Sequence, residues 1–215
     1  MKIERLIKDV SVYRFEMITG PMGCSKTEEL LRRIRRSILA KKHVKVITPE
    51  LDTRAKGDYI ESRNGLWLDA VKVASSHEIL HVVDETDEII DIDELQFFDE
   101  GIISVVKKLI MQGKKVIGSG LDLDFKGDPF GYMPELLCMA DKVDKLCAVC
   151  LKCGCETATR TQRLINGKPV DKNSPLIMIG GDETYEARCY DCWELPDIKT
   201  ENRKRGFKLL NFHSK

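Results

Sequence analysis

The sequence has no excess of charge of either sign and no long hydrophobic run. Its 215 residues contain 35 Lys and Arg against 35 Asp and Glu, so the formal net charge is zero. Proteins that bind long nucleic acids or anionic membranes by electrostatics usually carry a basic excess. No stretch approaches the roughly 20 consecutive apolar residues of a membrane-spanning helix. We therefore expect no nucleic-acid partner and no membrane partner, and a small-molecule substrate is favoured.

The amino-terminal stretch MKIERLIKDV lacks the apolar run of a secretory signal, which predicts a cytoplasmic protein. Most of the eight cysteines lie between Cys147 and Cys192. Without an export signal, this crowding favours reduced thiols that bind a metal over disulfide bonds. The composition, with 42% hydrophobic and 33% charged residues, is typical of a folded globular protein.

Short Val- and Ile-rich stretches alternate with stretches of helical periodicity. Strands are predicted over residues 14–20, 43–49, 88–93 and 114–121, and helices over residues 27–42, 76–82 and 98–113. Alternation of this kind is typical of an α/β fold with a parallel sheet that helices cover on both faces.

The pattern changes after about residue 144. Cysteines, an Asn-Gly pair at Asn166 and a Gly-Gly pair at Gly180 predict turns and hairpins there in place of further helices. We therefore divide the chain into an amino-terminal extension (1–13), an α/β domain (14–144), a smaller cysteine-containing domain (145–195) and a polar, flexible tail (196–215).

Residues 20–27, GPMGCSKT, resemble the phosphate-binding pattern G-x-x-x-x-G-K-[ST]. Gly20, Lys26 and Thr27 are in register, and Gly23 adds backbone freedom. A strand before the loop and a helix after it would direct backbone N–H groups at a phosphate. Lys26 would then contact the terminal phosphates of a bound nucleotide, and the Thr27 hydroxyl would bind Mg²⁺. A plain strand-to-helix turn is the alternative.

Ser25 stands where the pattern has its second glycine. Its backbone N–H can still contact a phosphate. A non-glycine residue in a left-handed conformation, however, costs about 1–2 kcal/mol. Ser25 therefore leaves open a protein that binds a nucleotide but is catalytically impaired.

Asp93 and Glu94 follow a strand that is predicted to be buried, at the carboxyl edge where ligands bind in parallel sheets. Asp93 can hold Mg²⁺ on the nucleotide phosphates, and Glu94 can accept a proton from an attacking hydroxyl group. The alternative is a solvated acidic turn.

Two Cys-x-x-Cys pairs, Cys150 with Cys153 and Cys189 with Cys192, have the spacing of a structural four-thiolate zinc site. Such a site is closed, so its zinc would stabilise the fold and would not catalyse. Cys147 and Cys150 have the same spacing and remain an alternative pair, although Gly154 after Cys153 favours the tight turn of a zinc knuckle.

Together these motifs resemble type II thymidine kinases of the bacterial and phage branch. The run DELQFF at 93–98 follows the GPM loop, and four further stretches agree in order: DTR (52–54), GLDLDFKGDPFG (120–131), TRTQRLINGKP (159–169) and GGDETYEARC (180–189). The similarity covers about residues 14–195. It implies a RecA-like P-loop NTPase domain with a small zinc-containing lasso domain, whose loop spans about residues 157–186.

The resemblance also implies the reaction and its residues. Glu94 would be the base for transfer of the ATP γ-phosphate to the thymidine 5′-hydroxyl, giving dTMP, and Arg54 would lie near the transferred phosphate. Feedback inhibition by dTTP and a homotetramer are implied as well. The residues at thymidine-pocket positions are Met22, Phe97, Leu121, Phe125, Phe130, Thr161, Met178, Gly180 and Tyr185.

The sequence departs from the family pattern at three positions: Ser25 in the phosphate loop, Leu95 where a small residue is usual, and Cys155 as an extra residue before the lasso loop. A second function class, a zinc-ribbon ATPase that acts on nucleic acid, would need a basic channel. The run RRIRR at 32–36 lies on a predicted helix beside an apolar stripe and is typical of a solvated or subunit-facing surface.

Overall fold

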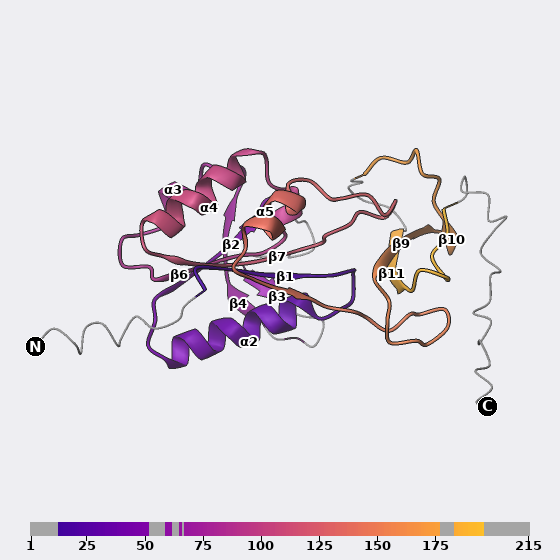
Figure 1. Ribbon diagram of the computed structural model, residues 1–215, viewed down its shortest axis with the longest axis horizontal. Coiled ribbons are helices and arrows are strands. Elements are labelled where there is room, and N and C mark those ends of the chain that lie inside the picture. Colours follow the sequence, from indigo (N-terminus) through magenta and orange to yellow (C-terminus); the bar gives the residue numbers. More distant parts are fainter. Residues whose placement is uncertain (1–12, 52–58, 62–64, 66, 177–182, 196–215) are drawn as a thin grey trace, which may run out of the picture.

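The computed structural model describes residues 13–51, 59–61, 65, 67–176 and 183–195. Its main body is a parallel sheet with helices on both faces (Figure 1). Helix α2 (Lys26–Leu39) covers one face, and helices α3 (Ile79–Val82), α4 (Gly101–Met111) and α5 (Met133–Met139) cover the other. The predicted α/β fold with helices on both faces of a parallel sheet is confirmed.

The six strands of the main sheet are all paired in parallel. Their order is β5 (Val71–Val73), β2 (Val44–Pro49), β6 (Ile89–Ile92), β7 (Lys115–Gly120), β1 (Phe15–Thr19) and β8 (Lys142–Lys145). The four predicted strands are present. Strands β5 and β8 and helix α5 were not predicted from the sequence. Charged residues alternate with the few valines of β5 and β8, so these strands lack the Val- and Ile-rich runs that marked the other strands.

Two smaller sheets complete the described residues. An antiparallel sheet contains β10 (Lys168–Pro169), β9 (Arg160–Ile165) and β11 (Glu183–Arg188), and a two-stranded ribbon contains β3 (Tyr59–Glu61) and β4 (Trp67–Asp69). Asn166 and Gly167, at the turn from β9 to β10, both have positive φ, 50° and 72°. This is the conformation that an Asn-Gly hairpin turn requires, so the predicted hairpin is confirmed.

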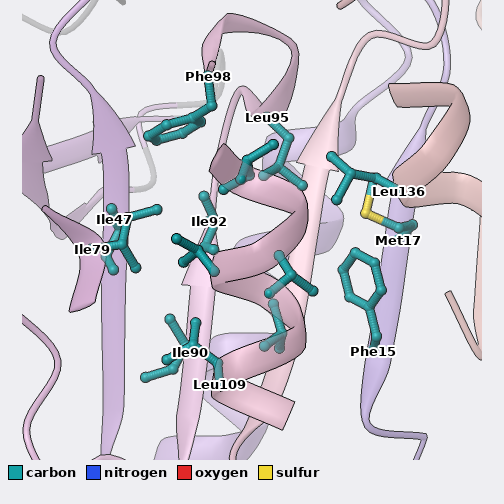
Figure 2. Close-up of a cluster of buried hydrophobic side chains, with 14 of the residues drawn as sticks. Phe15, Met17, Ile47, Ile79, Ile90, Ile92, Leu95, Phe98, Leu109 and Leu136 are labelled. Carbon is teal, nitrogen blue, oxygen red and sulfur yellow. The ribbon is translucent and has the colours of Figure 1, made fainter. Parts of the chain in front are cut away.

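Two apolar layers hold the helices on the main sheet. Figure 2 shows the layer beneath α4 and α5, to which β6 contributes Ile90 and Ile92 and α4 contributes Leu109. Ile18 and Ile117 belong to the second layer, which lies beneath α2. Successive side chains of a strand point to opposite faces of the sheet, so a single strand such as β1 contributes residues to both layers. The carboxyl end of such a strand is therefore packed on both faces.

Asp91 of β6 is a charged residue inside this core. It is fully buried, and neither carboxylate oxygen has a hydrogen-bond partner among the described residues. Burial raises the pKa of the Asp91 carboxyl well above its ordinary value of 3.8, and the charge of Asp93 adds to the increase while Lys115 opposes it. A raised pKa in the folded state means that folding favours the protonated acid.

We expect Asp91→Asn to gain stability relative to the natural chain as the pH rises from 4 to 8. In the natural chain, the raised pKa of Asp91 adds to the free energy of unfolding, and this stabilisation is complete at pH values below the pKa of the carboxyl in the unfolded chain. The stabilisation is lost as the pH rises toward the higher pKa of the carboxyl in the folded chain. An amide does not titrate, so it avoids the loss. Urea unfolding across this pH range measures the difference, with Asp69→Asn, a change at an exposed position of β4, as control. A pH-independent difference would contradict the prediction.

Candidate active site

The candidate site lies at the carboxyl ends of three adjacent strands, β6, β7 and β1. The phosphate-loop motif follows β1, and Asp93 and Glu94 follow β6, with β7 between them. Neighbouring strands lie about 4.8 Å apart, so the segments that leave β1 and β6 are about 10 Å apart. The Thr19 hydroxyl donates to the carbonyl of Gly120 at 2.9 Å and joins the end of β1 to the end of β7.

The phosphate loop is tightly folded around the side chain of Lys26. The Lys26 ammonium donates to the carbonyls of Gly20 at 3.1 Å and Pro21 at 2.8 Å, and it is buried. Gly20 has φ of 139°, and a Cβ there would lie 2.4 Å from the carbonyl oxygen of Leu146. Only glycine fits at this position. The ammonium group thus lies within the loop, at the amino terminus of α2, where anions bind favourably.

Ser25, the first departure from the motif, adopts the left-handed conformation, with φ of 64° and ψ of 29°. Its side chain makes no capping hydrogen bond to the helix, although its carbonyl accepts the first helical bond, from the Glu29 amide at 3.0 Å. Gly23 also has a positive φ, 76°. The serine therefore occupies a backbone conformation that glycine adopts without strain.

Hydrogen bonds hold Asp93 and Glu94 in place. Asp93 Oδ1 accepts hydrogen bonds from the Ser119 hydroxyl and from the Glu94 amide, the latter at 2.9 Å. The Gln96 side chain donates Nε2–H to the Glu94 carboxylate, and its Oε1 accepts from the Leu121 amide at 3.0 Å. Glu94 is buried and left-handed, with φ of 51°. Non-glycine residues held in this way cluster at functional sites.

The sequence interpretation did not assign roles to Gln96 and Ser119. Gln96 stands inside the DELQFF run, so its position in the motif was the available signal. No sequence signal pointed to Ser119, because only the pairing of β6 with β7 brings its hydroxyl to Asp93.

Contacts among the described residues connect several of the predicted thymidine-pocket positions. The rings of Phe97 and Phe130 meet edge to face, with centroids 5.7 Å apart. The Met22 amide donates to the Thr161 hydroxyl at 3.1 Å and joins the phosphate loop to β9. Leu121 and Phe125 are buried in the segment after β7, and Tyr185 of β11 is half-buried opposite β9. Arg54, Met178 and Gly180 lie outside the described residues.

Four cysteines converge beside the small sheet. The sulfur atoms of Cys150, Cys153, Cys189 and Cys192 all lie within 4.8 Å of one another. The Cys153 and Cys189 sulfurs are 3.7 Å apart. Four thiolates around zinc at about 2.3 Å place neighbouring sulfurs roughly 3.8 Å apart, so this group fits a tetrahedral zinc ion. Cys147, the alternative ligand, is exposed and does not belong to the group.

A family model described as thymidine kinase matches residues 13–193. The chain belongs to the thymidine kinase family. This confirms the resemblance to thymidine kinases and is consistent with the bacterial and phage branch, and it makes the protein a kinase, an enzyme that transfers a phosphoryl group. Among the described residues, no helix is long and apolar enough to cross a membrane.

In this kinase, we expect Ser25→Gly to raise the free energy of unfolding by about 1 kcal/mol, because glycine removes the 1–2 kcal/mol cost of a left-handed side chain and loses part of that gain in backbone entropy. The turnover rate should change by less than about tenfold, which corresponds to 1.4 kcal/mol. Ser25→Ala, which keeps the Cβ atom, is the matched control and should show no gain. Equal stability of the glycine and alanine variants in urea would refute the assignment of strain.

Proposed function

We propose that this kinase transfers the γ-phosphate of ATP to the 5′-hydroxyl of thymidine and gives dTMP. The observation that carries the proposal is the position of Glu94. It is buried at the end of β6, held by Gln96, and only one strand separates β6 from the strand that leads into the phosphate loop. A carboxylate in this place is within reach of a hydroxyl nucleophile that faces a bound triphosphate.

In the proposed reaction, Glu94 takes the proton of the 5′-hydroxyl as its oxygen attacks the γ-phosphorus. The new O–P bond forms while the bond from the γ-phosphorus to the β–γ bridging oxygen breaks, and ADP leaves with the electron pair. Lys26 would contact the phosphates. Asp93 and Thr27 offer oxygen ligands of the kind that Mg²⁺ prefers. Bound Mg²⁺ would offset the charge of the phosphates, and Arg54 would act near the transferred group.

The same proposal assigns zinc to Cys150, Cys153, Cys189 and Cys192, because their sulfurs fit its tetrahedral radius. From the family resemblance we further propose that dTTP inhibits the enzyme by feedback and that the protein is a homotetramer. From the sequence we propose a cytoplasmic location. Competition of dTTP with thymidine and light scattering in solution test the first two.

The decisive assay follows the conversion of thymidine to dTMP with γ-labelled ATP and Mg²⁺. We expect label transfer to thymidine, and deoxyuridine as a second acceptor measures selectivity. Single-stranded DNA is added to a parallel ATPase reaction. Stimulation of ATP hydrolysis by DNA without transfer to thymidine would favour the zinc-ribbon ATPase. Binding of both substrates without transfer, in the natural chain and in Ser25→Gly, would favour the impaired relative.

A further inference from the structure

The segment between β7 and α5, residues 121–132, extends from the main sheet toward the small sheet of β9, β10 and β11 (Figure 1). It contains three of the proposed thymidine-pocket residues, Leu121, Phe125 and Phe130. An isolated antiparallel bridge between Leu123 and Pro129 closes it into a hairpin-like loop. The position of this loop therefore determines the shape of the proposed nucleoside pocket.

Trp193 holds this loop through its indole group. The indole N–H donates to the carbonyl of Phe125 at 3.1 Å, and Trp193 is 5% exposed. The indole also packs on Gly127, where a Cβ would lie 3.0 Å from a ring carbon of Trp193. Both contacts fix the tip of the loop against the small domain.

The backbone of Trp193 is itself fixed by the four-cysteine turn and by β9. Its amide donates to the carbonyl of Cys189 at 3.0 Å, directly after Cys192. The next residue, Glu194, makes two hydrogen bonds with the Gln162 side chain, at 2.8 Å through its amide and 3.0 Å through its carbonyl. The backbone that carries the indole is thus fixed by Cys189, a proposed zinc ligand, and by Gln162 of β9.

Arg163 of β9 holds the ring of the same phenylalanine. Its side chain is completely buried, and the guanidinium carbon lies 5.2 Å from the centroid of the Phe125 ring. The guanidinium also donates to the carbonyl of Pro175 at 2.5 Å. Phe125 is therefore held at two points, its carbonyl by Trp193 and its ring by Arg163. A cation and an aromatic ring attract each other strongly where water is excluded.

We propose that Trp193 is a positioning residue for the nucleoside: its indole N–H fixes Phe125 and thereby connects the four-cysteine turn to the thymidine pocket. This inference rests on the proposed function. The indole N–H bonds to the carbonyl of Phe125, and both Phe125 and Gly127 lie outside the phosphate loop. Loss of the indole N–H should therefore weaken the interaction with thymidine and leave the interaction with ATP unchanged.

The chain has two tryptophans, which makes the test specific. The second, Trp67, lies on β4 and is 60% exposed. Trp67→Phe leaves Trp193 as the single indole fluorophore, and we expect its thymidine phosphorylation to match the natural chain. Titration of this variant with thymidine should change the emission of Trp193, and titration with a non-hydrolysable ATP analogue should not. No response to saturating thymidine would overturn the inference without any change at position 193.

Trp193→Phe keeps an aromatic ring and removes the N–H group. If thymidine binding must re-order the loop that this bond normally holds, the free energy of one buried hydrogen bond sets the scale, and we expect the KM for thymidine to rise about 5- to 20-fold while the KM for ATP changes less than about twofold. The zinc content should stay equal to that of Trp67→Phe. An unchanged thymidine KM, equal increases in both KM values, or loss of zinc would each overturn the positioning role.

Failure of the proposed function is distinguishable from failure of this inference. If the function is wrong, the natural chain and Trp67→Phe both fail to phosphorylate thymidine, and both proposals fall together. If only the inference is wrong, both proteins phosphorylate thymidine, and Trp193→Phe shows an unchanged thymidine KM, equal increases in both KM values, or loss of zinc.

Discussion

We expect Glu94→Gln to lower kcat for thymidine phosphorylation by about 10² to 10⁴, the usual effect of removing a general base. The glutamine side chain has the size of the glutamate and can still accept the hydrogen bond from Gln96 Nε2. It cannot take the proton of the 5′-hydroxyl. The left-handed backbone at this position, φ of 51°, affects both side chains equally, so the loss reports chemistry and not strain.

Binding measurements separate this effect from damage to the site. The Kd for ATP should change little in Glu94→Gln, because the phosphate loop and Lys26 are unaltered. Glu85→Gln, a change at an exposed position before β6, is the control and should keep the natural kcat. If Glu94→Gln keeps half of the natural kcat, Glu94 is not the base.

The second large effect concerns the four cysteines. We expect one zinc per natural chain, and we expect Cys150→Ser to lose it almost completely. Structural zinc binds with roughly 10–16 kcal/mol of apparent free energy in zinc-finger peptides, which is comparable to the whole stability of a domain. Cys150 and Cys189 pack in a buried cluster with Cys24 of the phosphate loop and with Ala148. Loss of zinc should therefore disorder residues 145–195 and also weaken ATP binding.

Metal analysis measures the zinc content, limited proteolysis measures the disorder, and the Kd for ATP measures the weaker binding. Cys147→Ser is the matched control, because Cys147 has the same Cys-x-x-Cys spacing to Cys150 but lies outside the sulfur cluster. It should keep full zinc and resist proteolysis like the natural chain. Equal zinc loss in both variants would mean that the ligand set is wrong.

The spacing of the cysteines predicts that a zinc site exists but does not by itself determine which four cysteines form it. Two Cys-x-x-Cys pairs predicted a zinc site, but Cys150 belongs to two possible pairs in the sequence. In the structure, the turn that closes with the Gly154 amide on the Cys150 carbonyl, at 2.8 Å, brings Cys153 toward Cys189. The two Cys-x-x-Cys pairs lie in turns that are more than 35 residues apart in the sequence. Only the folding of the chain between these turns decides which cysteine completes the four-sulfur group.

The phosphate-loop motif likewise predicts which residues lie in the loop but not their backbone conformation. The phosphate-loop pattern placed Lys26 and Thr27 at the start of a helix, and α2 begins at Lys26. The pattern left the conformation of Ser25 open, and the structure places it in the left-handed region. A motif describes which side chains follow one another, whereas φ at one residue depends on the path that the whole loop takes through the fold.

By itself, the sequence determined the parallel α/β fold, the phosphate-loop motif, the acidic pair at the end of β6, the cysteine spacing and the family. Periodicity and motifs carry this information because they act over a few residues. The tertiary structure alone decided that Gln96 joins Glu94 to Leu121, that Ser119 bonds to Asp93, and that Trp193 holds Phe125. These contacts connect residues up to 68 positions apart, and no local pattern encodes a hydrogen bond that only the packing of two elements creates.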